Sequence, residues 1–143
     1  MSAKDSKALE RRFLEEWNKG KAAAMSVIDE TCATKIVWHG STGEDIRGIE
    51  GFKKSMTEFF DAFPDQHFTI DDIFAEGDKV AVRYTITGTH KGNFMGVPPT
   101  NKKIKLWAIE VDRIVGGKYV ECWIRLDTLS FMQQLGLVPA SGK

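Results

Sequence analysis

Asp127 carries a carboxyl group that could move a proton, depending on what surrounds it. In a strand without a bulge, the two-residue period places Asp127 on one face with Trp123 and Arg125. An aspartate becomes a useful general base when burial in an apolar cavity raises its pKa towards the operating pH. This alternation predicts one face made of Tyr119, Glu121, Trp123, Arg125 and Asp127, and an opposite face made of Val120, Cys122, Ile124 and Leu126.

The nearby Arg125 could affect Asp127 in three ways. A guanidinium within reach of Asp127 would lower the pKa of the carboxyl group and weaken it as a base. The same positive charge could instead stabilise an enolate, or the two side chains could form a structural ion pair. For Asp127 to act as a base, its side chain must therefore face an apolar cavity and lie away from Arg125.

Histidine and cysteine provide no metal or nucleophile motif in this sequence. Cys32 and Cys122 have no CxxC spacing, and His39, His67 and His90 lie too far apart to complete a ligand set. We expect both cysteines to be free, buried thiols, with no metal bound. His39 could enter the cavity as an acid, base or hydrogen-bonding partner, or be satisfied by a turn, whereas His90 is expected at the surface or as a loop anchor.

The composition predicts one domain over residues 1–143. With 20 basic and 20 acidic residues the formal net charge is zero, so no global field attracts nucleic acid or an anionic membrane. No window approaches the ~20 apolar residues that span a membrane, and Met1–Arg12 has no apolar signal segment. We therefore expect a cytoplasmic protein whose partner is a small molecule or a second copy.

Periodicity predicts helices first and long hairpins last. Apolar residues recur at helical spacing in three segments, and the clearest of these is closed by Pro64. The predicted helices are 2–18, 22–28 and 49–63, and the predicted strands are 33–39, 45–47, 66–75, 79–90, 102–115 and 118–129. This segregation predicts an α+β fold with an antiparallel sheet.

Several strings carry a family resemblance over most of the chain. They are Trp38–Gly40, Arg47–Phe52, Phe63–Asp65, Glu76–Arg83, Gly88–Thr100, Gly117–Trp123 and Gln134–Gly136. With them the chain resembles the SnoaL-like polyketide cyclase or ester cyclase family, in the NTF2-like superfamily. The resemblance implies three N-terminal helices packed on a curved antiparallel sheet, forming a cone that encloses a pocket.

The resemblance also implies a reaction. Polyketide cyclases of this family close a ring by an intramolecular aldol step, in which a carboxylate removes an acidic Cα proton and no cofactor takes part. In this sequence, the residue that resembles this carboxylate by its position is Asp127. Many relatives carry a histidine directly before the tryptophan of the last strand, and this sequence has Cys122 there, which weakens a direct transfer of mechanism.

A pocket of this kind would be lined by aromatic and polar side chains, with Phe94–Pro99 as its mouth. By analogy with ketosteroid isomerases, Tyr84 with Asp112 or Glu110 are nominal candidates for an oxyanion hole. The expected binding residues are Trp17, Trp38, His39, Phe59, Phe63, Tyr84, Phe94, Met95, Trp107, Trp123 and Arg125.

Two other functions stay open at this point. The pocket could bind a small apolar or carbonyl compound without turnover, in a homodimer formed through the outer sheet surface, as NTF2-like domains commonly do. Apolar residues compatible with that surface are Leu106, Ala108, Val120, Ile124 and Leu126. Alternatively, the stretch from Arg125 to Asp127 resembles the Arg-x-Asp pair of limonene epoxide hydrolases, which share this fold.

Overall fold

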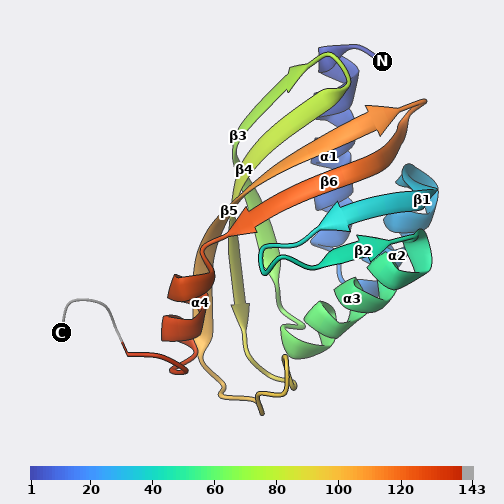
Figure 1. The fold of residues 1–143 in the computed structure, drawn as a ribbon. Helices are drawn as coiled ribbons and strands as arrows, with labels where there is room; N and C mark the ends of the chain where they lie inside the picture. Colours follow the sequence, from blue (N-terminus) through green and yellow to red (C-terminus); the bar gives the residue numbers. More distant parts are fainter. Residues whose placement is uncertain (140–143) are drawn as a thin grey trace.

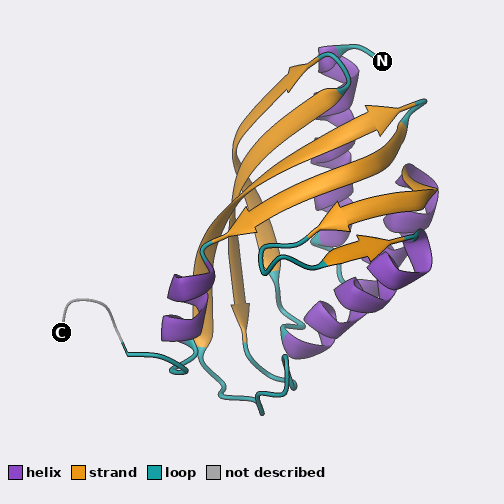
Figure 2. Ribbon diagram, viewed as in Figure 1, coloured by secondary structure: helices purple, strands orange, loops and turns teal. Residues whose placement is uncertain are grey.

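A computed structural model describes residues 1–139, in which a six-stranded curved sheet is covered by helices (Figures 1 and 2). The last four residues of the domain expected over 1–143 lie outside this range. The helices are α1 (Ala3–Trp17), α2 (Lys21–Thr31), α3 (Ile49–Ala62) and α4 (Thr128–Gln134). The strands are β1 (Cys32–His39), β2 (Asp45–Arg47), β3 (His67–Glu76), β4 (Lys79–Thr89), β5 (Lys103–Val115) and β6 (Lys118–Leu126).

The strand order is β2-β1-β6-β5-β4-β3, which confirms the meander predicted for the second half of the chain. The β3–β4 and β5–β6 connections are tight hairpins with Gly77, Gly116 and Gly117 at positive φ, where glycine carries no steric penalty. β1 pairs in parallel with β6, so the sheet is mixed, whereas the sequence predicted an antiparallel one. Local periodicity could not reveal this pairing, because the two strands are far apart in the chain.

Helices α1, α2 and α3 cover the concave face of the sheet, as the sequence predicted (Figure 2). α1 begins with a capping box in which Ser2 and Asp5 each bond the other's backbone N–H. Its buried stripe is formed by Ser6, Glu10, Leu14 and Trp17. No helix within residues 1–139 is both long enough and apolar enough to cross a membrane.

Helix α4 was not predicted, because 118–129 was expected to continue as a strand. The strand ends at Leu126 instead, and Asp127 caps the new helix by accepting a hydrogen bond from the Ser130 N–H at 3.1 Å. α4 is held to β5 by Gln134, whose side chain accepts from the Lys105 N–H at 2.7 Å and donates to the Lys105 carbonyl at 2.9 Å.

A β-bulge in β6 decides which residues enter the interior. Tyr119 pairs with Ile114 and Glu121 pairs with Arg113, so Val120 is the extra residue. As a result, Tyr119 and Cys122 are both buried, whereas the unbulged alternation would have put them on opposite faces.

Candidate active site

The interior of the cone holds a group of titratable side chains from four elements. The inward residues of β4 and β5 alternate with outward ones, and the bulge in β6 brings two more side chains inward. α1 adds a carboxyl group from the opposite side. We call this group the interior cluster, and it consists of Glu10, Tyr84, Glu110, Asp112, Tyr119 and Cys122.

Two tyrosines of the interior cluster donate to carboxylates. The Tyr84 hydroxyl donates to Glu110 Oε1 at 2.6 Å, and the Tyr119 hydroxyl donates to Glu10 Oε2 at 2.7 Å. Both distances are typical of short bonds to a charged acceptor. Glu110 is half-buried, whereas the other carboxyl groups of the cluster are almost fully buried. Glu110 is therefore the carboxyl group that a ligand could reach most directly.

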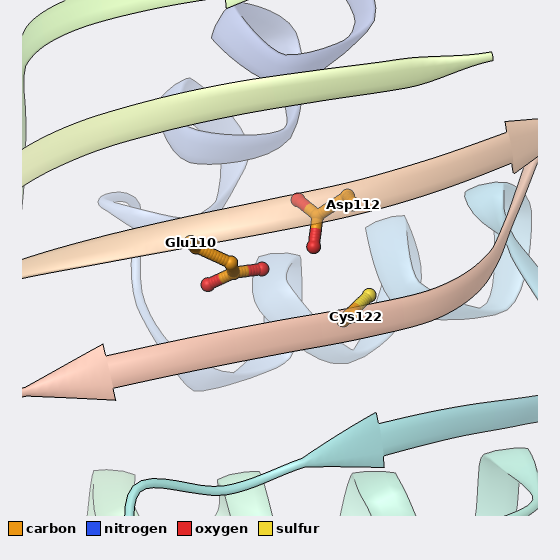
Figure 3. A group of neighbouring side chains, drawn as sticks. All are labelled: Glu110, Asp112 and Cys122. Carbon is orange, nitrogen blue, oxygen red and sulfur yellow. The ribbon is translucent and has the colours of Figure 1, made fainter.

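Asp112 lies beside Glu110 and Cys122, with ligating atoms of the three residues all within 4.8 Å of one another (Figure 3). Asp112 is 1% exposed, and its Oδ1 has no hydrogen-bonding partner within residues 1–139. In the same part of the chain, no lysine, arginine or histidine forms an ion pair with Glu10, Glu110 or Asp112. Three carboxyl groups thus share an interior without a compensating cation.

This crowding raises the pKa values of the cluster. Burial, and after it the charge of Glu110, raises the pKa of Glu10 from 4.5 to about 7. The same two causes raise the pKa of Asp112 well above its ordinary value. The raised pKa favours the neutral, protonated form of Asp112, which can donate a hydrogen bond, while Glu10 titrates near neutrality.

The remaining members of the cluster stay protonated as well. Burial raises the pKa of Tyr84 and of Tyr119 well above 10, and the neighbouring carboxylates add to this effect. Burial also raises the pKa of the Cys122 thiol, which makes it a poor nucleophile. A metal held by Glu110, Asp112 and Cys122 would need the deprotonated thiolate of Cys122, which the raised pKa disfavours. These three residues are therefore better suited to exchanging protons through hydrogen bonds than to binding a metal.

Asp127 lies elsewhere in the structure. It is exposed and caps α4, and so does not meet the condition of facing an apolar cavity. Arg125 is also exposed and donates to the carbonyls of Ile124 at 2.8 Å and Gly40 at 3.3 Å. Within residues 1–139 no ion pair joins Asp127 to Arg125, and Asp127 does not share the interior with the cluster, so its role as a base stays a prediction.

We predict that Asp127 contributes chiefly to stability. Replacing Asp127 with alanine removes the acceptor for the Ser130 N–H and should lower the free energy of unfolding by about 1 kcal/mol. The variant Asp127→Asn keeps a capping oxygen, so its loss should be much smaller. Urea denaturation of the two variants measures this difference, and equal losses would contradict a capping role.

His39 and Trp123 lie on the outer face of the sheet, although they were expected to line the pocket. The His39 ring is held between Asp45 and Glu121, both at 2.7 Å, and stacks on Trp123 with ring centroids 5.4 Å apart. The bonds to Glu121 and then Asp45 raise the pKa of His39. Register explains the placement, since His39, Trp123 and Val111 occupy one outward row across three strands.

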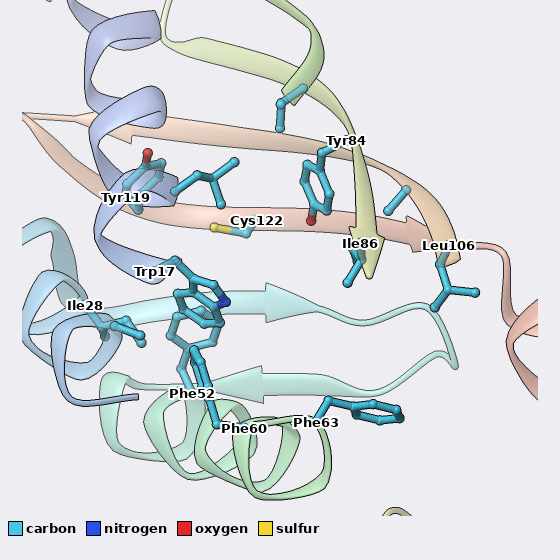
Figure 4. Packing of buried hydrophobic residues seen from close by; sticks show 14 of the residues in the cluster. Trp17, Ile28, Phe52, Phe60, Phe63, Tyr84, Ile86, Leu106, Tyr119 and Cys122 are labelled. Atoms are coloured by element: carbon cyan, nitrogen blue, oxygen red, sulfur yellow. The ribbon is translucent and has the colours of Figure 1, made fainter. Parts of the chain in front are cut away.

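The other expected binding residues divide between interior and surface. Trp17, Phe63 and Tyr84 are buried in the interior (Figure 4). Trp38 packs on Phe52, while Phe59 and Phe94 are half-buried against Phe63. Met95 is 75% exposed and Trp107 is 52% exposed, so neither lines the interior.

Buried hydrophobic side chains pack around the cluster (Figure 4). A hollow of about 440 Å³ is bounded by Asp65, Thr89, Lys103 and Gln134, among others, and another of about 310 Å³ lies between α1 and β3. Neither includes a residue of the interior cluster. These two surface hollows are therefore separate from the interior cluster.

Sequence reasoning missed Glu10 entirely. Its signal was available, because Glu10 stands four residues before Leu14 on the same helical stripe that buries Trp17. Asp112 and Glu110 were named only as nominal oxyanion donors, and the structure does bring Glu110 into contact with Tyr84. The expectation that both cysteines are free and buried is confirmed.

Comparisons with known proteins connect this arrangement to one family. A family model described as SnoaL-like polyketide cyclase matches residues 7–135. Aklanonic acid methyl ester cyclase DauD from Streptomyces sp. (strain C5) is 29% identical over 131 residues, covering 90% of this chain and 80% of the relative.

Solved structures agree with this match. AclR from Streptomyces galilaeus, described as a proposed hydroxylase, is 33% identical, with a TM-score of 0.86 over 99% of this chain and 87% of its own. IdmH from Streptomyces antibioticus, described as a proposed polyketide cyclase, is 29% identical, with a TM-score of 0.77 over 91% of this chain and 97% of its own. The α+β cone predicted from the sequence is confirmed by these structures.

Proposed function

Because this chain belongs to the SnoaL-like polyketide cyclase family, we propose that it closes a ring in a small, polyketide-like carbonyl compound without a cofactor. The observation that carries the proposal is the interior cluster, in which the half-buried carboxyl group of Glu110 accepts from Tyr84 beside the buried Asp112, whose raised pKa favours its neutral form. A base and two neutral donors are the groups that enolate chemistry requires.

In the proposed step Glu110 removes a proton from a carbon next to a carbonyl group. As Glu110 takes this proton, the Tyr84 hydroxyl turns from Glu110 to the enolate oxygen, which also accepts a hydrogen bond from the protonated form of Asp112. The enolate carbon then attacks a second carbonyl carbon of the same substrate, forming the C–C bond, and the proton on Glu110 passes to the new alkoxide. Substrate and product are isomers, so the step needs no oxidant, reductant or water.

Glu10 supports this chemistry from the helix side. Because its pKa is about 7, it exchanges its proton near neutrality, and through Tyr119 it links α1 to β6. Its negative form raises the pKa of Asp112 further, which keeps that side chain a donor. We assign Glu10 a positioning role, since it bonds Tyr119 and not a reacting group.

Aklanonic acid methyl ester, after which the two cyclases DauD and DnrD are named, is the first substrate to test. Incubation with purified protein should give a product of unchanged mass with an altered chromatographic retention time. Heat-denatured protein serves as the control for spontaneous closure. If this ester and a panel of related diketo esters all remain unchanged while they bind, the protein is a binding domain and the cyclase proposal fails.

Non-catalytic binding is the second candidate function. It is favoured by the hollow of about 440 Å³ beside Asp65 and Gln134, which includes no residue of the interior cluster and could hold a ligand away from the proposed reacting groups. A binding protein would retain ligand affinity in a Glu110→Gln variant and show no turnover in the native protein. The hydrolase alternative gains no support from Arg125 and Asp127, because both are exposed and no ion pair joins them within residues 1–139.

We also propose that two copies associate through the outer face of the sheet. The residues first considered for this surface are corrected, because Leu106 and Ala108 are buried inside, and Ile124 and Leu126 pack against the core. The outward side chains of β3, β4, β5 and β6 form an apolar strip instead. It consists of Phe74, Ala81, Trp107, Ile109, Val111 and Trp123.

Replacing Trp107 with glutamate should weaken this association at least about tenfold, because an exposed aromatic side chain that the proposed interface would bury becomes a charge. Sedimentation velocity over a range of protein concentrations measures the change. Met95→Glu is the matched control, since Met95 is also exposed but lies in the loop between β4 and β5. A monomeric native protein at every concentration would contradict the proposal.

A further inference from the structure

His90 is a fully buried histidine that the proposed reaction does not use. It follows the last residue of β4, is 0% exposed, and its ring stacks on Phe63 with centroids 5.3 Å apart. On one side it anchors the loop 90–102, because its Nδ1 lies 3.2 Å from the Thr100 backbone nitrogen and 3.0 Å from Thr100 Oγ1. The expectation of a loop anchor is therefore met, whereas a surface position is wrong.

The contact with Thr100 fixes the tautomer of this ring. A backbone N–H can only donate, so Nδ1 must be the unprotonated acceptor and Nε2 carries the hydrogen in the neutral ring. That Nε2 has no hydrogen-bonding partner among the residues the structure describes. His90 thus presents a buried N–H donor whose desolvation is not offset by any side chain or carbonyl of that part of the chain.

The surroundings of His90 are aromatic and come from three segments of the chain. Phe63, at the end of α3, contacts Phe94 of the loop 90–102 and Phe131 of α4. Phe94 also stacks on Phe131, with centroids 5.4 Å apart. The loop around Phe94 is largely exposed, and Met95 next to it adopts a φ of 50°. Movement of this one loop would therefore open the aromatic cover over Phe63.

We propose that the Nε2–H of His90 is a ligand-binding donor, which takes the oxygen of an apolar carbonyl compound once the Phe94 loop has moved. A donor left unpaired in apolar surroundings favours a ligand that carries an oxygen acceptor over one of the same shape without it. The inference rests on the proposed function only in that carbonyl compounds enter the interior, and it does not require turnover.

This contact point is separate from the proton-transfer group. His90 follows Tyr84 by six residues, an even number, so both side chains point to the inward face. Six residues of extended chain separate the two positions by roughly 20 Å. The oxygen held by His90 is therefore a different one from the oxygen at which the enolate forms. The hydrogen bond from His90 would determine the orientation in which a ligand enters the interior.

Two variants separate the two roles of the ring. His90→Asn places an amide oxygen near the position of Nδ1, so it keeps the acceptor for Thr100 and loses the distal donor. His90→Gln reaches further, so it can keep a distal N–H and loses the proximal acceptor. Melting curves of both variants check that each one folds.

The binding test uses acetylnaphthalene and the matching isomer of ethylnaphthalene, which differ by one carbonyl oxygen. In the native protein the ketone should bind about three- to tenfold more tightly than the hydrocarbon, as expected for one neutral hydrogen bond. His90→Asn should abolish this preference, and His90→Gln should retain part of it. A preference that survives in His90→Asn would overturn the proposal.

Nitrogen-15 NMR of the native protein tests the inference without any variant. The free protein should show His90 as the Nε2–H tautomer, and acetylnaphthalene should shift the Nε2–H proton downfield while ethylnaphthalene does not. An Nδ1–H tautomer, or an Nε2–H signal indifferent to the ketone because a buried water holds it, would overturn the proposal. Since neither readout involves turnover, a failed cyclase assay leaves this test intact.

Discussion

Replacing Glu110 with glutamine should lower kcat for ring closure at least about a hundredfold, because glutamine cannot accept the Cα proton. The amide oxygen of the variant can still accept from Tyr84, so the fold and the affinity for substrate should change little. The loss should therefore fall on kcat, with KM nearly unchanged. Initial rates across a range of substrate concentrations measure both constants.

Asp127→Asn is the matched control for this experiment. Asp127 is the carboxyl group to which the family resemblance points, yet it is exposed and caps α4. Asparagine preserves the cap and removes only the ability to take a proton, so kcat should stay within about twofold of the native value. A large loss of kcat in Asp127→Asn with native rates in Glu110→Gln would contradict our assignment and restore Asp127 as the base.

The stability of the protein should fall as the pH rises from mildly acidic to mildly basic. Glu10 has a pKa of about 7 in the folded protein, against 4.5 for an unperturbed glutamate, chiefly because it is buried. Between these values the folded protein keeps a proton that the unfolded chain has released. Its stabilising contribution is complete below about pH 4.5 and is lost as the pH passes through about 7.

The size of this loss in stability follows from the difference between the pKa values of Glu10 in the folded and unfolded chain. A difference of this size corresponds to about 3 kcal/mol in the free energy of unfolding, which is roughly 6–12 °C in Tm for a chain of this length. Asp112, whose pKa is also raised, acts in the same direction. Circular dichroism melts at constant ionic strength, from about pH 5 to about pH 8, would measure the fall.

Glu10→Gln should flatten this dependence, because the amide stays neutral and its oxygen can still accept from Tyr119. Its Tm should exceed that of the native protein at the basic end of the range. Glu15→Gln, on the exposed side of the same helix, should leave the slope unchanged. A native Tm that stays flat or rises with pH would contradict a buried, proton-holding Glu10.

Most of the fold could be predicted because its signals are local. The helical spacing of Phe52, Met56, Phe60 and Phe63 predicted α3, and the glycines at 77 and 116–117 predicted the hairpins. The parallel pairing of β1 with β6 depends on contacts distant in sequence, which periodicity does not record. α4 is only seven residues long, too short for its spacing to distinguish it from a strand end.

The candidate site was harder to predict because one residue reverses the pattern on which it depends. Strict alternation kept Tyr119 with Trp123 on one face, but the bulge at Val120 turns Tyr119 inward beside Cys122 and leaves Trp123 outside. No turn residue or glycine marks that bulge. Glu10 was overlooked for another reason, since a charged residue on an amphipathic helix is ordinarily assigned to the solvent face.

The hydrogen bonds of Gln134 to β5 affect how readily strands of other chains can pair with this sheet. β6 leaves the sheet opposite Ala108, so β5 continues towards Lys103 with one side of its backbone open. At Lys105 the Gln134 amide takes both backbone groups, as one residue of a neighbouring strand would. An open ladder of this kind is a template for intermolecular strand addition and fibril growth. A single side chain on a short helix thus protects the protein against aggregation along this stretch of β5.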